Sequence, residues 1–164
     1  YAAPGTYFIT LFTHHGKSLF GEVRSGVMNL NDLGTIAAAE WQRTFVMRKN
    51  VIDQGWIVMP THMHAMFTFD YPDAPDITID AARKVSARSV GAIMAGYKSS
   101  VTSRIRRELE HAEEKVWHRN YYEVVIKDEA RFNAVYEYIP TNPARWSDDQ
   151  YNPESAKWKP PETR

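Results

Sequence analysis

Apolar and polar residues recur along the first half of the chain with periods that distinguish strands from helices. The segment 6–13 (TYFITLFT) is β-branched and aromatic with a period of two, which is typical of a strand. Apolar residues on both sides of a Ser-Gly pair predict a hairpin over 22–30. Asn31 and Asp32 can cap a mostly apolar amphipathic helix that runs to about Lys49.

The second half of the chain continues the alternation of strands and helices. Two strands are predicted over 51–59 and 62–69, and a third over 121–126. Helical periodicity covers 81–114 and about 127–142. This order of elements predicts an α+β fold, in which the helices pack on one face of an antiparallel sheet.

Length and composition limit the class of protein. A chain of 164 residues suits one domain, which we expect over 1–146, and a tail over 147–164 that is extended or partly disordered. The absence of Cys excludes disulfides and thiolate metal ligands. No run approaches the ~18 apolar residues of a membrane span, so we expect a cytoplasmic protein with no membrane partner.

The charges balance overall but are unevenly placed. With 20 basic and 20 acidic residues, the net charge of zero is not typical of a strong nonspecific nucleic-acid binder. The densest basic cluster lies on the helix predicted over 81–114 and consists of Lys98, Arg104, Arg106 and Arg107. Two interpretations carry equal weight: a solvated helix face with i,i+4 ion pairs, or a helix that contacts phosphates.

The apolar stretch 55–69 (GWIVMPTHMHAMFTF) contains a pair of histidines two residues apart, His62 and His64. On a strand, residues i and i+2 point to the same face, so the two imidazoles would converge. Two converging imidazoles can hold one metal ion and leave the rest of its coordination sphere open. A polar pair on a half-solvated strand is an equally good interpretation of these residues alone.

The last predicted helix offers partners for a metal site. Tyr138 lies on the flank of its apolar stripe, and Asn142 lies four residues later on the same side. The stripe itself consists of Phe132, Val135, Tyr136 and Ile139, so we expect Tyr136 in the core. A phenol becomes a nucleophile when its proton is removed, and an amide oxygen can ligate Mg²⁺ or Mn²⁺. Tyr97, beside Lys98, is a rival nucleophile that spacing does not exclude.

Four blocks of the sequence resemble one known family. They are VMPTHMH over 58–64, the helix segment 91–105, VWHRNYYE over 116–123 and EYIPTNPARW over 137–146. In this order they resemble the single-tyrosine HUH transposases, and most closely the group associated with repetitive extragenic palindromic (REP) elements of bacteria. The resemblance covers roughly residues 5–153.

The resemblance implies a ferredoxin-like or RRM-like sheet and a metal-dependent nuclease and transposase of single-stranded DNA. It implies that His62, His64 and Asn142 hold Mg²⁺ or Mn²⁺, and that Tyr138 forms a 5′-phosphotyrosine link. It disfavours Tyr97. The implied partner is hairpin DNA in the bacterial nucleoid, bound by a monomer or a homodimer. Basic residues are the expected backbone contacts: Lys98, Arg104, Arg106, Arg107 and Arg119.

Two positions depart from the family pattern. Thr61 stands beside the histidines where Asn is usual, so the hydrogen bonds that orient the rings are expected to differ. Pro140 lies in the last helix two residues after Tyr138, where it removes a backbone donor and favours a kink. Both changes bear directly on the geometry of the predicted site.

Two other functions stay open beside a tyrosine nuclease. One is an RRM-like DNA- or RNA-binding module whose nuclease activity has decayed and whose histidines are structural. The other is a metal-dependent hydrolase that uses activated water in place of Tyr138.

Overall fold

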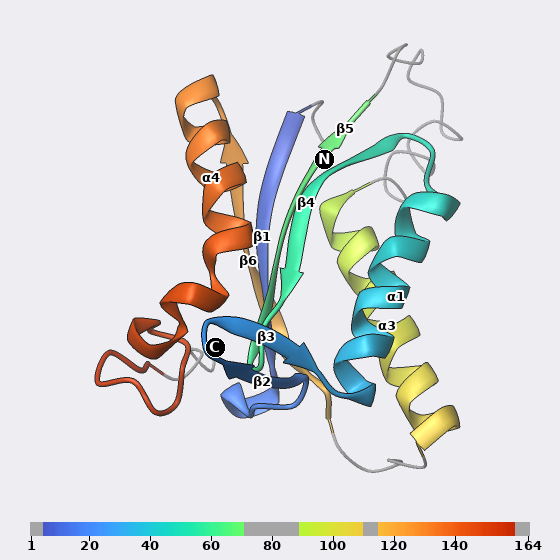
Figure 1. Ribbon diagram of the computed structural model, residues 1–164. Coiled ribbons are helices and arrows are strands. Elements are labelled where there is room, and N and C mark those ends of the chain that lie inside the picture. Colours follow the sequence, from blue (N-terminus) through green and yellow to red (C-terminus); the bar gives the residue numbers. More distant parts are fainter. Residues whose placement is uncertain (1–4, 71–88, 110–114, 160–164) are drawn as a thin grey trace.

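The computed structural model describes residues 5–70, 89–109 and 115–159. Four strands form an antiparallel sheet (Figure 1). In spatial order they are β4 (Val51–Val58), β5 (His62–Phe69), β1 (Gly5–Thr13) and β6 (Trp117–Ile126). A separate hairpin of β2 (Gly21–Arg24) and β3 (Val27–Leu30) follows a short turn, η1 (His14–Gly16).

Three α-helices accompany the sheet within the described residues: α1 (Asp32–Met47), α3 (Val90–Leu109) and α4 (Glu129–Thr141). Without the hairpin and α4, the chain order is strand, helix, strand, strand, helix, strand, with β1 and β5 in the centre of the sheet. This is the ferredoxin-like arrangement, which four-stranded RRM domains share. The predicted α+β class is confirmed.

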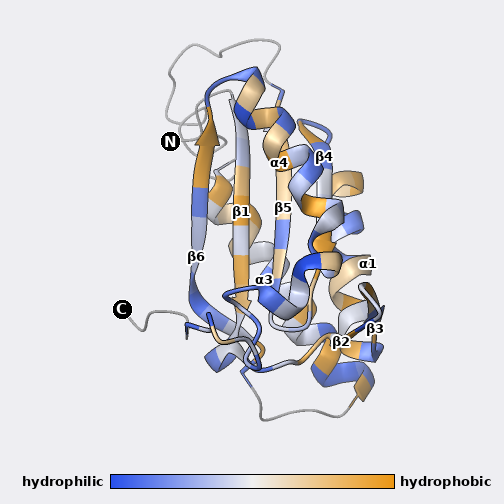
Figure 2. Ribbon diagram, turned by 60° about the vertical axis from the view of Figure 1, so that its left-hand side comes forward, coloured by the Kyte–Doolittle hydropathy of each residue, from blue (hydrophilic) through white to orange (hydrophobic). Residues whose placement is uncertain are grey.

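The expectation that the helices pack on one face is wrong, because α4 lies on the opposite face from α1 and α3. Figures 1 and 2 show the sheet between the two helical layers. The residues of β5 that point to α1 and α3, such as Met63 and Phe67, belong to the main core. Met66 points the other way and packs with Val135 and Ile139 of α4. A central strand buried on both faces explains the nearly unbroken apolar run of β5.

The predicted elements agree with the structure apart from their ends. Asn31 caps α1 as predicted, since its side-chain oxygen accepts a hydrogen bond from the N–H of Gly34 at 2.9 Å. Strand β6 begins at Trp117, before the predicted start at 121. Of the helix predicted over 81–114, the structure describes 90–109 as α3, and residues 81–88 and 110–114 lie outside the described part.

Two glycines in helices make a matched test of the packing between the hairpin region and α1. A Cβ at Gly34 would lie 2.1 Å from the backbone oxygen of Phe20, whereas one at exposed Gly96 of α3 would meet nothing closer than 3.7 Å. We expect Gly34→Ala to lower the free energy of unfolding by about 1–3 kcal/mol. We expect Gly96→Ala to raise it by about 0.5–1 kcal/mol, since alanine favours the helix. Urea denaturation of both variants checks this, and equal effects would contradict the packing.

Candidate active site

His62 and His64 lie side by side on β5, on the sheet face that α4 covers. Their ring centroids are 4.5 Å apart, as expected for alternate residues of one strand. The strand register pairs His64 with Thr10 and His62 with Phe12 of β1. Only 0% and 2% of the two residues is exposed, so their ring nitrogens face protein atoms and not bulk water.

The hydroxyl of Thr61 determines which nitrogen of His62 carries the proton. It donates to the carbonyl oxygen of Tyr151 at 2.8 Å and lies 3.1 Å from His62 Nδ1. Because a hydroxyl has one hydrogen, its oxygen must accept from Nδ1–H of the imidazole. His62 Nε2 is then a lone-pair acceptor, and it has no hydrogen-bond partner among the described residues. Burial, and then the adjacent His64, lower the pKa of His62 well below 6.5, so the ring stays neutral.

His64 connects the histidine pair to the candidate nucleophile. Its Nδ1 lies 2.9 Å from the hydroxyl of Thr10, and its Nε2 lies 3.4 Å from the hydroxyl of Tyr138. Burial lowers the pKa of His64 to about 3, so this imidazole is neutral too. The ring of Phe8 stacks on it at a centroid distance of 5.2 Å. A threonine hydroxyl therefore orients each histidine through Nδ1, and both Nε2 atoms remain for the site.

Helix α4 brings Tyr138 and Asn142 to the histidines from the other end of the sequence. Asn142, the C-cap residue that follows the helix, is 1% exposed, and neither polar atom of its side chain makes a hydrogen bond within the described residues. The amide nevertheless lies close enough to His62 and Tyr138 to interact with both. The sequence placed these two residues on one side of the helix, and the structure brings them together at the histidine pair.

Pro140 does not separate Tyr138 from Asn142. The helix continues through Pro140 and tightens, because the N–H of Asn142 donates to the carbonyl oxygen of Ile139 at 3.3 Å. The tight turn runs on into η2 (Pro143–Asp148). Pro140, which departs from the pattern of the family that the sequence resembles, therefore changes the backbone after Tyr138 and does not move Asn142 away from it.

The buried polar atoms fit a divalent metal ion. His62 Nε2 and Asn142 Oδ1 are acceptors without hydrogen bonds, and leaving such atoms unpaired in the interior costs free energy. Within 5–70, 89–109 and 115–159, no group of three His, Cys, Asp or Glu side chains could hold a metal. An oxygen ligand for the histidine pair would therefore come from Asn142.

The two candidate nucleophiles differ sharply in position. Burial, with a contribution from Asp149, raises the pKa of the Tyr138 phenol, while the amide of Asn142 and the guanidinium of Arg145 act to lower it. Tyr138 is thus protonated at neutral pH and needs help to become a nucleophile. Tyr97 lies in the core between α3 and α1, where its hydroxyl donates to the carbonyl oxygen of Ala37 at 3.0 Å. No substrate can reach Tyr97 there.

The C-terminal segment covers the histidine pair. The ring of Tyr151 lies 5.0 Å from that of His62 and 4.9 Å from that of Phe12, and Trp146 lies 6.0 Å from His62. Asn152 is buried and donates to the carbonyl oxygen of Trp146 at 2.9 Å. The tail expected over 147–164 is therefore packed on the site in its described part, through 159. The division of the chain into a domain and a tail stays a prediction.

Lys98 reaches from α3 to the backbone of β6. Its ammonium group donates to the carbonyl oxygens of His118 and Arg119 at 2.9 and 3.1 Å. The pairing of β6 with β1 shifts at this place, which turns these carbonyls toward the lysine. Burial lowers the pKa of Lys98 to about 8. Lys98 thus supports an irregular strand, whereas Arg119 is exposed on it.

The predicted basic cluster of α3 lies on the sheet face opposite the histidines. Arg104 forms ion pairs within the protein, since its Nη1 lies 3.2 Å from the buried carboxylate of Glu40 and its Nε lies 2.9 Å from the carboxylate of Glu108. Arg107 lies 3.4 Å from Glu108, and Arg106 is exposed. The structure does not bring these residues to the site, and their contact with DNA stays a prediction.

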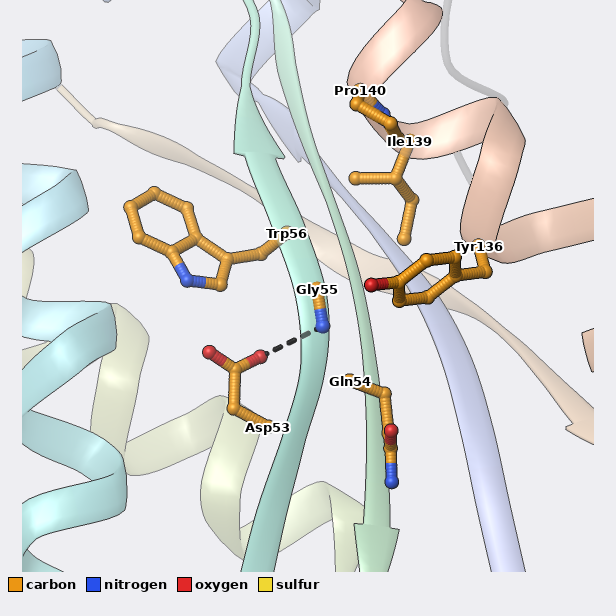
Figure 3. A pocket seen from close by; sticks show the side chains of 7 residues that line it. All are labelled: Asp53, Gln54, Gly55, Trp56, Tyr136, Ile139 and Pro140. Carbon is orange, nitrogen blue, oxygen red and sulfur yellow. Dashed lines mark hydrogen bonds between the residues drawn. The ribbon is translucent and has the colours of Figure 1, made fainter. Parts of the chain in front are cut away.

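A groove of about 450 Å³ lies between the edge strand β4 and α4 (Figure 3). Asp53, Gln54 and Gly55 line one side, where the strand bulges, and Tyr136 and Pro140 line the other. The expectation that Tyr136 belongs to the core is wrong, because 57% of it is exposed and its ring lies along this groove. The apolar stripe of α4 is narrower than its periodicity predicted. Val135 and Ile139 alone are buried there.

Sequence reasoning missed two contributors to the site, Thr10 and Tyr151. Thr10 is the middle residue of a predicted strand, and its role depends on the register between β1 and β5. Tyr151 lies in a Pro- and Asp-rich segment with no periodic pattern. Its only signal in the sequence is that it is a large aromatic residue, one of two in a mostly polar tail.

No family model matches the chain. An uncharacterized protein of Haemophilus influenzae is 32% identical over 158 residues, which cover 92% of this chain and 86% of that protein. The chain belongs to the family of this Haemophilus protein. A solved structure, described as a REP-associated tyrosine transposase bound to a REP hairpin, matches 88% of this chain and 70% of that one. The TM-score is 0.53 at 19% identity, so this member of the family shares the transposase's fold.

The described helices of this family member include none that combines the length and the apolar character needed to span a bilayer.

Thr61 can be tested as the residue that orients His62. We expect Thr61→Val to lower the free energy of unfolding by about 1–3 kcal/mol, because His62 Nδ1–H and the carbonyl of Tyr151 both lose their partner. Thr61→Ser keeps the hydroxyl and should cost only about 0.8 kcal/mol for the lost methyl group. Urea denaturation of the three proteins without added metal checks this. A serine variant as unstable as the valine variant would show that the hydroxyl is not what matters.

Proposed function

We propose that this protein is a metal-dependent nuclease and transposase that cleaves and rejoins single-stranded DNA through a 5′-phosphotyrosine at hairpin, REP-like elements. The observation that carries the proposal is the approach of the Tyr138 hydroxyl to His64 Nε2, at 3.4 Å, beside two buried acceptors without partners. The fold shared with a REP-associated tyrosine transposase supports it.

His62 and His64, through Nε2, and Asn142, through Oδ1, would hold the ion, Mg²⁺ or Mn²⁺. When bound, such an ion supplies Lewis-acid polarisation of a phosphate oxygen. The hydroxyls of Thr61 and Thr10 hold the two rings in the orientation that this needs. The residues of the chain therefore position the phosphate, and Tyr138 carries the covalent chemistry.

The phenol oxygen of Tyr138 attacks the phosphorus, and the bond from phosphorus to the 3′-oxygen of the preceding nucleotide breaks. The phenol loses its proton, and the departing oxygen gains one as a 3′-hydroxyl. The energy of the phosphoester is kept in the new bond, so attack by a 3′-hydroxyl reverses the step and rejoins DNA strands. The raised pKa of Tyr138 keeps the phenol inert until a positive charge is near.

The cover over the histidines sets a condition for this chemistry. His62 and Asn142 are 0% and 1% exposed beneath Trp146 and Tyr151, so this segment must move before a phosphate reaches them. The same burial favours a second candidate function: a nucleic-acid-binding module in which the histidines are structural. A covalent protein–DNA product separates the two.

The nucleophile is tested by a denaturing gel with labelled single-stranded hairpin DNA and Mn²⁺ or Mg²⁺. The wild-type protein should give a protein-linked band that disappears with a chelator. Tyr138→Phe should lose the band entirely, because no other described tyrosine hydroxyl is hydrogen-bonded to the histidine pair, while DNA binding persists. Tyr136→Phe, on the same helix and exposed, is the matched control and should keep the band. Cleavage without a linked band in Tyr138→Phe would instead indicate activated water.

Metal binding is tested by thermal unfolding without DNA. An ion that binds only the folded state at about 100 times its Kd stabilises by about 2.7 kcal/mol, which raises Tm by roughly 5–10 °C in a domain of this size. We expect Mn²⁺ to produce such a shift and a chelator to reverse it. His62→Gln should abolish the shift, and His15→Asn, at an exposed histidine, should keep it. An equal shift in both variants would place the metal elsewhere.

A further inference from the structure

Tyr122 is a large aromatic side chain that no other described element covers. It lies on the edge strand β6 and is 64% exposed. Helix α4 packs on β4 and β5 and reaches β6 at its last residue, Ile126. Figure 2 shows the body of β6 to the left of α4, at the edge of the sheet. The ring is therefore free to contact a partner from solution.

The register places Tyr122 in the same row as the candidate site. Tyr122 of β6 pairs with Thr10 of β1, and Thr10 pairs in turn with His64 of β5. Residues directly opposite on neighbouring strands point to the same face, so all three share the face of α4. Two strand spacings of about 4.8 Å put Tyr122 roughly 10 Å from His64 along the row.

Tyr122 also borders the segment that covers the histidines. The ring of Tyr151 lies 4.9 Å from that of Phe12, and Phe12 lies two residues after Thr10 on the same face of β1. The exposed ring of Tyr122, opposite Thr10, thus lies next to the strand position on which the covering segment packs. A strand of DNA that reaches Tyr138 from this side passes over Tyr122.

We propose that Tyr122 is a base-stacking residue, which holds the nucleobase next to the scissile phosphate of single-stranded DNA. The inference rests on the proposed function and adds the subsite that positions its substrate. A π-face on a sheet surface suits any unpaired base, because every base has a π-face of its own. Tyr122 therefore contributes affinity and position but little preference for sequence.

The test measures binding of a hairpin oligonucleotide with single-stranded flanks of mixed sequence, in chelator, by fluorescence anisotropy. Stacking is worth about 1–3 kcal/mol per base, so Tyr122→Thr should weaken binding about 5- to 150-fold. Threonine is used because it keeps the strand preference. Tyr122→Trp should bind within about threefold of wild type. Tyr136→Thr, at an exposed tyrosine away from the row, is the control and should bind like wild type.

An abasic scan of the flanks identifies the stacked base without relying on a variant. At one abasic position, the affinity of wild type should fall to that of Tyr122→Thr for the intact oligonucleotide. The affinity of Tyr122→Thr itself should not fall further at this position. 2-Aminopurine at that position should be quenched by wild type and not by Tyr122→Thr. Equal losses at every position, or equal affinities of wild type and Tyr122→Thr, would overturn the inference.

The outcomes separate this inference from the proposed function. If the abasic effect depends on Tyr122 while no covalent adduct forms, base stacking stands and the nuclease is refuted. If the adduct forms while Tyr122→Thr binds and reacts like wild type, the nuclease stands and the stacking subsite is refuted. A protein that binds no single-stranded DNA refutes both.

Discussion

The arrangement of this protein depends on keeping two neutral imidazoles side by side between a sheet and a helix. A charged pair at this distance, away from water, would repel and lose its solvation, and the lowered pKa values of both rings express that cost. Two threonine hydroxyls from different parts of the chain occupy Nδ1 of each ring. Both rings consequently present Nε2 to the space below α4. The position of α4, and with it of Tyr138, is determined by the small apolar contact of Val135 and Ile139 with Met66.

The burial that keeps the rings neutral also keeps a phosphate out. The cover consists of short turns around Trp146 and Tyr151, joined to the body by a few hydrogen bonds and ring contacts. Segments of this kind open at a lower free energy than the core, because they bury little apolar surface. The main core, between the sheet and the pair α1 and α3, is a separate and larger cluster. Opening of the cover, which the proposed function requires, would therefore leave that core intact. Tyr122 lies beside the cover and is 64% exposed with the cover in place.

Charge along the sequence is a poor guide to charge available for a ligand. Lys98 and Arg104 belong to the densest basic cluster of the chain, yet one supports the backbone of β6 and the other neutralises buried Glu40. Their neighbours Arg106 and Arg107 remain exposed, on the face away from the histidines. The guanidinium of Arg145, outside that cluster, is instead the cation that interacts with the Tyr138 phenol. A helix carries its charges around its whole circumference, and packing decides which of them stay in water.

The sequence by itself determined the class of fold, most of the elements, and the local pairings His62 with His64 and Tyr138 with Asn142. These follow from strand and helix periods, which act over a few residues. That the two pairs meet was implied only by the resemblance to a known family, and not by any spacing. Tertiary structure alone decided that α4 lies on the opposite face from α1 and α3, that Tyr136 faces a groove, and that Tyr151 covers His62. Each of these depends on strand register, on which face a helix packs, or on the path of an aperiodic tail. Those are contacts between residues far apart in the chain, and no local pattern encodes them.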